Sequence, residues 1–180
     1  MYSDIKTQLE ESYGPDFTIK DYGYGFSIIF NNPGITVAGH DVESVSFGFC
    51  YSLGQDGYIS KDESATSFYS AEYIFSSEPN NSVAENLHLK MNELYGKSDQ
   101  EEYRPKHIRN KLDLSRLSWS DNGIYITLYN STNLSVSYLW DNGFSRRQEL
   151  SELIGYLKEV EEQRQKDAEQ EQFGNSTDGL

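Results

Sequence analysis

The chain has 180 residues, a formal net charge of −14 and a single cysteine. Its length fits one domain with a sizeable core, and 14 Tyr, 9 Phe and 2 Trp supply aromatic bulk that disordered chains lack. The negative charge disfavours binding to nucleic acid or to an anionic membrane surface, and one cysteine excludes an intramolecular disulfide framework.

The first half of the chain predicts one helix and several strands. Apolar residues recur at helical spacing up to Gly14-Pro15, so we expect a helix over residues 3–13. Residues 17–30 predict a hairpin around Gly23 and Gly25, and a short strand should follow at ITVAG. Strict alternation then predicts two longer strands, at residues 45–53 and 69–75. The first of them should have one bulky face and one face of small residues.

The second half predicts two helices and two strands. Ser82 is the expected cap of a helix over 82–95 that ends at Gly96, and residues 97–111 suggest a long loop. Alternating strands are expected at 124–128 and 134–140. Ser145 and Gln148 form a capping-box pattern before a helix over 146–165, whose apolar stripe stops at Val160. The charged sequence beyond it indicates a helix that projects from the core.

These elements define the expected fold class. We predict an α+β domain with a largely antiparallel sheet of about six or seven strands, packed by two to three helices. The domain should span residues 1–160, followed over 161–180 by a polar helical extension and a disordered tail. EESYGPD and NELYGKS are similar, so two helix-Gly-strand units could reflect a duplication; the alternative is that helices often end in an aromatic residue and glycine.

The segment SLGQDGYISKDE, residues 52–63, matches the second half of an EF-hand calcium loop. With Gly57 as the turn glycine, Asp56 and Glu63 fall on ligand positions, but Ser52 and Gly54 fall where carboxylates are normally required. The preceding sequence also has strand rather than helix periodicity. Asp56-Gly57 between two strand-like runs therefore indicates a hairpin turn.

The remaining candidates for chemistry are isolated. His40 beside Asp41 suggests a base and its orienting carboxylate, whereas Gly39 next to them suggests a turn; His88 and His107 lie far from His40 in the sequence. Cys50 could act as a nucleophile only beside a histidine, and its small neighbours favour a packed, unreactive thiol. We therefore predict no catalytic, cofactor-binding or metal-binding residues.

Two surface hypotheses involve charged and aromatic residues. Basic side chains cluster in one segment, where they could dock an acidic or phosphate-bearing partner or simply offset nearby carboxylates: Arg104, Lys106, Arg109, Lys111 and Arg116. Aromatic residues in neighbouring strands could bind carbohydrate or peptide, with core packing as the alternative: Trp119, Tyr125, Tyr129 and Trp140.

Three stretches carry a resemblance to known sequences: YSAEYIF at 69–75, LYGK at 94–97 and LSWSDNGIYITL at 117–128. In these features the chain resembles uncharacterised bacterial proteins that are often lipoproteins or secreted, over about residues 35–140. The shared motifs are structural, so the resemblance implies no active site. It does imply an envelope-targeting segment upstream.

The expected function is a non-catalytic interaction or accessory domain of a bacterial protein. The alternative is a small acidic intracellular protein that neutralises a basic partner, as immunity proteins do, and a hydrolase built around His40 is a third class. No signal peptide or membrane-spanning run is visible. The location is cytoplasmic if Met1 is the native start and extracytoplasmic if a leader has been removed.

Overall fold

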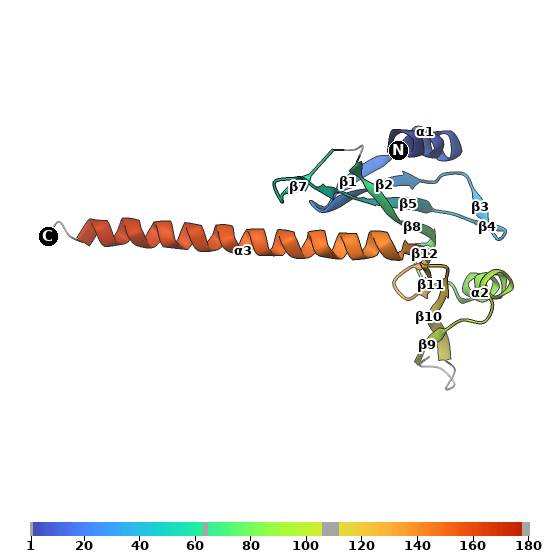
Figure 1. Cartoon of the computed structure of the whole chain (residues 1–180). Helices are drawn as coiled ribbons and strands as arrows, with labels where there is room; N and C mark the ends of the chain where they lie inside the picture. The colour runs from blue at the N-terminus through green and yellow to red at the C-terminus, as the bar shows by residue number, and fades with distance from the viewer. Residues whose placement is uncertain (1, 63–64, 106–111, 178–180) are drawn as a thin grey trace.

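The computed structural model describes residues 2–62, 65–105 and 112–177. These residues form an α+β fold of three helices, a large antiparallel sheet of eight strands and two small two-stranded sheets (Figure 1). The predicted fold class is confirmed, with eight strands in the main sheet in place of the expected six or seven. Among the described residues, no helix combines the length and apolar character needed to cross a membrane.

The main sheet consists of two four-stranded halves. In spatial order its strands are β1 (Thr18–Asp21), β2 (Gly25–Asn31), β5 (Ser44–Cys50), β8 (Ser67–Ser76), β12 (Leu134–Trp140), β11 (Ile124–Asn130), β10 (Leu112–Asp121) and β9 (Gln100–Pro105). Helix α1 (Tyr2–Tyr13) precedes the first four, and α2 (Asn81–Tyr95) precedes the last four. Each half is thus a helix followed by a four-stranded meander, and the halves meet at the β8–β12 pair.

A local two-fold relation follows from the register of that central pair. Glu72 on β8 lies opposite Ser137 on β12, and the strands are antiparallel. A two-fold axis that passes between Glu72 and Ser137 exchanges the residue that follows each of them, Tyr73 and Tyr138. It also relates the helix ends at Tyr13 and Tyr95, which carry the sequence similarity. The topology is the arrangement that a duplication would produce.

The two faces of the sheet differ in chemistry because side chains alternate along each strand. We call the face that carries α1 and α2 the helical face. Its residues form most of the buried core, including Ile28, Val45, Leu117, Ile126 and Leu128. We call the opposite face the serine face, after Ser27, Ser46, Ser70, Ser135 and Ser137.

A buried asparagine anchors the start of α2. Asn130 is fully buried; its Oδ1 accepts the Asn80 backbone N–H at 2.8 Å, and its Nδ2 donates to Asn81 Oδ1 at 2.8 Å and to the Leu114 carbonyl at 3.1 Å. Asn80, and not the expected Ser82, caps the helix, because its side chain accepts the Val83 N–H.

Helix α3 (Asp141–Thr177) begins before the predicted capping box at Ser145 and lies first on the serine face. Gly143 packs against Tyr69, Leu150 is fully buried, and the Arg147 guanidinium lies over the rings of Tyr24 and Tyr69 at 5.2 and 5.6 Å. Residues 161–169 are exposed, and the helix, about 55 Å long at 1.5 Å per residue, projects away from the sheet (Figure 1).

Several short or polar strands differ from the sequence expectation. The edge strand β9 lies within residues 97–111, which were expected to form a loop because the polar sequence QEEYRP has no apolar alternation. The expected strand over 45–53 divides at Tyr51, whose N–H donates to the Tyr24 carbonyl at 3.0 Å. The small sheets pair β3 (Thr36–Val37) with β4 (His40–Asp41) and β6 (Ser52–Leu53) with β7 (Ile59–Ser60).

Candidate functional site

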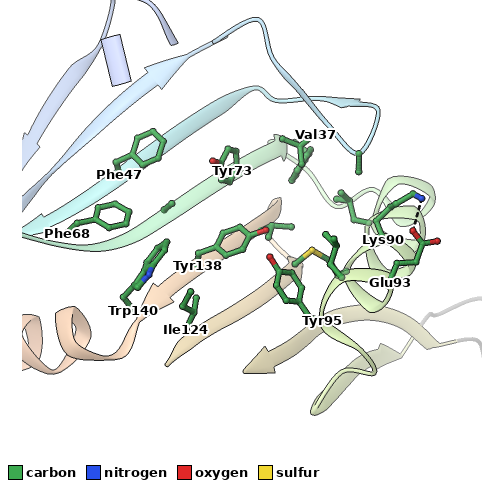
Figure 2. Close-up of a pocket in the computed structure, with 17 residues that line it drawn as sticks. Val37, Phe47, Phe68, Tyr73, Lys90, Glu93, Tyr95, Ile124, Tyr138 and Trp140 are labelled. Carbon is green, nitrogen blue, oxygen red and sulfur yellow. Dashed lines mark hydrogen bonds and ion pairs between the residues drawn. The ribbon is translucent and has the colours of Figure 1, made fainter. Parts of the chain in front are cut away.

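An apolar groove lies on the helical face over the central strands β8 and β12, with α2 on one side (Figure 2). It has a volume of about 680 Å³. Side chains of the central strands form its floor: Ala71, Tyr73, Phe75, Val136, Tyr138 and Trp140. Phe47 and Phe68 extend the floor toward the first half, and Leu87, Met91 and Tyr95 of α2 form one wall. The groove exists because neither helix covers β8 and β12.

Three tyrosines line this groove, Tyr73, Tyr95 and Tyr138, and a fourth, Tyr13, lies against Tyr73, so that the four are related in pairs by the local two-fold. The hydroxyls of Tyr13 and Tyr73 are 3.4 Å apart, and the hydroxyl of Tyr138 interacts with that of Tyr95. The rings of Tyr73 and Tyr138 meet edge to face, with centroids 6.2 Å apart. Burial, and then the neighbouring tyrosine hydroxyl, raises the pKa of Tyr73 and of Tyr138 well above the ordinary value. The four phenols thus form a row, and its two inner members, Tyr73 and Tyr138, lie in the floor of the groove.

The raised tyrosine pKa values predict a loss of stability at alkaline pH. Near pH 10 these phenols ionise in the unfolded chain but stay protonated in the folded one, so the unfolded state binds fewer protons. Stability is therefore complete below about pH 10 and falls above it, by up to about 1.4 kcal/mol per pH unit for each tyrosine. Urea unfolding at pH 8 and pH 11 should show a markedly smaller fall for the double variant Tyr73→Phe/Tyr138→Phe than for the wild type.

Tyr156 gives the matched control for this measurement, because its side chain is 63% exposed on α3. The variant Tyr156→Phe should lose as much stability between the two pH values as the wild type. Equal losses in the double variant and the wild type would show that the two groove phenols titrate normally.

The mouth of the groove carries a paired charge and an exposed leucine. Lys90 Nζ lies 2.8 Å from Glu93 Oε2, so the two charges at the rim compensate each other (Figure 2). Leu94 beside them is 72% exposed. Val37 and Ala38, from the β3–β4 hairpin, line the other side, and the same hairpin contacts α2 where His40 Nε2 lies 3.0 Å from Asn86 Nδ2.

The calcium-like segment forms a hairpin, as predicted. Gly57 has a φ of +80°, the Gly54 N–H donates to the Tyr58 carbonyl at 2.8 Å, and the Asp56 carboxylate accepts the Tyr58 N–H at 3.1 Å. Glu63 lies outside the described residues. Among those described, no group of three or more His, Cys, Asp or Glu side chains is placed to hold a metal ion.

The structure separates the other candidate residues. His88 is half-buried, its ring centroid 6.3 Å from that of Trp119, and His107 lies outside the described residues. Cys50 is fully buried, with Sγ 3.5 Å from the Ser67 carbonyl and 3.9 Å from the Gly143 carbonyl. Burial raises the pKa of this thiol. Cys50 is a packed thiol beneath the start of α3.

The structure describes only part of the basic segment, and it places the four aromatic residues of the other surface hypothesis apart. Arg116 pairs with Glu102 at 3.3 Å and lies over the Tyr129 ring, Arg104 is on β9, and residues 106–111 lie outside the described part of the chain. The four aromatics do not share one surface. Trp119 is buried beneath α2 and Trp140 lines the groove, whereas Tyr125 and Tyr129 lie on the serine face beside a second hollow whose lining is both polar and apolar.

The fold and the groove define the class to which this chain can be assigned: an α+β domain of two helix-plus-meander halves that share an apolar groove. Comparisons with protein-family models, with curated proteins and with solved structures each returned no match. The resemblance to bacterial envelope proteins therefore stays a prediction.

The groove itself was missed by reasoning from the sequence. Its floor joins residues 65 positions apart, Tyr73 and Tyr138, which only the β8–β12 pairing brings together. A weak signal was present in the repeated Tyr-Gly ends of the two helices, at Tyr13-Gly14 and Tyr95-Gly96. Those tyrosines are the outer members of the phenol row.

Proposed function

We propose that this chain is a non-catalytic interaction domain that binds an apolar segment of a partner protein in the groove over β8 and β12. One observation carries the proposal: a pre-formed apolar hollow of about 680 Å³ on a face that is otherwise covered by helices. Concave apolar surfaces with a few placed polar groups are the usual form of binding sites. The resemblance to bacterial envelope proteins extends the proposal to an accessory role there.

The chemistry of the groove supports binding over catalysis. None of the 17 residues that line it is a histidine, cysteine, serine or threonine, and its one carboxylate, Glu93, is paired with Lys90. Its polar groups are neutral phenols and the Lys90–Glu93 pair. Such groups orient a ligand by hydrogen bonds, and the aromatic floor supplies the apolar contact.

Two exposed leucines of α2 provide a matched test. Leu94 lines the mouth of the groove and is 72% exposed, whereas Leu89 is 63% exposed and does not line it. A photo-crosslinking residue at position 94 should form a discrete adduct with one partner in the native cell, and the same residue at position 89 should not. The partner is then identified by mass spectrometry and purified.

With the purified partner, Leu94→Arg should weaken binding by at least about tenfold, because it places a charge at the desolvated mouth. Leu89→Arg adds the same charge and should leave the affinity unchanged. Equal adducts from both positions, or equal effects of both arginines, would contradict a role for the groove.

The second candidate is an acidic protein that neutralises a basic partner, and the net charge of −14 is the observation that favours it. This role requires association to weaken steeply as salt rises and a basic, toxin-like protein to be encoded beside this one. Binding that is insensitive to salt would reject it and leave the groove proposal intact.

A further inference from the structure

We propose that the groove receives an amphipathic α-helix of the partner, with its apolar face on the floor and lysine or arginine residues on its outer face. The inference rests on the proposed function and names the shape and charge of the segment that is bound. Three independent features support it: the spacing of α1 and α2, the lack of a free strand edge in the groove, and the charge of the elements around it.

The spacing between α1 and α2 corresponds to one missing helix. Tyr13 at the end of α1 contacts Phe30 on β2 and Phe47 on β5, with ring centroids 5.4 and 5.3 Å apart, and α2 packs over β10 and β11. The midpoints of these strand pairs are four strand spacings apart, or about 19 Å. Because packed helices lie about 8–10 Å apart, the space between the two has the width of one helix.

An extended peptide has no backbone partners in this groove. Strand addition requires an unpaired edge, as in domains that bind peptides by extending a sheet. Here β8 is paired with β5 and β12, and β12 is paired with β8 and β11, so both floor strands are internal. A helix satisfies its own backbone groups and needs only side-chain contact, which the aromatic floor provides.

The negative charge around the groove favours a partner helix whose exposed face is basic. The elements that flank it carry an excess of carboxylates over lysines: Asp4, Glu10 and Glu11 against Lys6 on α1, Glu85 and Glu93 against Lys90 on α2, and Asp41 at the β3–β4 hairpin. A partner with lysine or arginine on its exposed face gains steering and rim attraction. The α3 helix of a second copy is disfavoured, since residues 158–172 of that helix are themselves net acidic.

The test uses synthetic peptides of about 18 residues, long enough for several helical turns. The first contains leucine and lysine with leucines at i, i+3, i+4 and i+7; the second has glutamate in place of lysine; the third has the first composition in strict alternation, which favours a strand. Trp140 lies in the groove, so its fluorescence reports occupancy, and Trp140→Phe identifies its contribution. Thermal unfolding checks that each protein variant is folded.

The helical leucine-lysine peptide should bind at least about tenfold more tightly than either of the other two. Leu94→Arg should weaken that binding by a similar factor, while the charge-matched Leu89→Arg should not. Tighter binding of the alternating peptide in the groove would overturn the helix and leave the proposed function standing. Equal binding of the glutamate peptide would overturn the basic outer face. Occupancy by a small apolar dye together with no binding of any peptide would reject both proposals.

Discussion

Replacing Trp119 by alanine is expected to lower the free energy of unfolding by about 3–5 kcal/mol. The indole is only 2% exposed, packed between β10 and α2. Its Nε1 donates to the Gly96 carbonyl at 3.0 Å and to Asn92 Oδ1 at 3.2 Å, at the C-terminal end of α2. The substitution therefore leaves a cavity and also removes a donor from the end of the helix that forms one wall of the groove.

The other tryptophan of the chain gives the control for this prediction. Trp140 is only half-buried in the groove, with its ring centroid 4.7 Å from that of Phe68. Trp140→Ala should cost about half as much or less, because part of its surface is already in contact with water. Urea unfolding followed by far-UV circular dichroism measures both variants. A smaller loss for Trp119→Ala than for Trp140→Ala would contradict the placement of Trp119 beneath α2.

The tightly alternating strands and the amphipathic parts of the helices could be predicted from the sequence because local periodicity sets them. The strand over 69–75 is observed as Ser67–Ser76, and the helix over 82–95 as Asn81–Tyr95. Long-range contacts decided the remaining details. Asn80 became the cap of α2 because Asn130, 50 residues away, holds its backbone N–H. Local patterns cannot show such a partner.

The groove could not be predicted for a related reason. It depends on which strands meet in the middle of the sheet and on which face each helix lies, and both are consequences of topology. The repeated Tyr-Gly ends of α1 and α2 pointed to two similar units, but their meeting edge was unknown. Once β8 and β12 pair, the two-fold relation places Tyr73 beside Tyr138 and leaves a gap between the helices.

The two halves of the sheet differ in one connection between strands, and this difference makes the two ends of the groove unlike each other. Between β2 and β5 the first half carries the β3–β4 hairpin, whereas the equivalent connection in the second half, between β10 and β11, is a tight turn at Asn122 and Gly123, both with positive φ. The hairpin reaches the groove through Val37 and Ala38. A helix bound there would thus meet different neighbours at its two ends, which would fix its direction.

The same substitution at two glycines of α3 should have opposite effects. Gly143→Ala is expected to destabilise the domain by about 3 kcal/mol, the upper part of the usual range for overpacking. A Cβ at this position would lie 2.7 Å from Tyr69 Cα and 2.9 Å from the Phe68 carbonyl oxygen, and closer still to Tyr69 Cβ. Because two of these are backbone atoms, relief requires the start of α3 to move off the serine face.

Gly155 lies on the same helix, and a Cβ added there would meet no other atom within 4 Å. Gly155→Ala should therefore stabilise the domain by up to about 1 kcal/mol through helix propensity alone.

Displacement of α3 in Gly143→Ala should also expose Cys50, whose Sγ lies 3.9 Å from the Gly143 carbonyl. Reaction with a thiol reagent under native conditions should thus be faster in Gly143→Ala than in the wild type and unchanged in Gly155→Ala. Equal stability and equal thiol reactivity of the two variants would contradict the close packing of α3 on Tyr69.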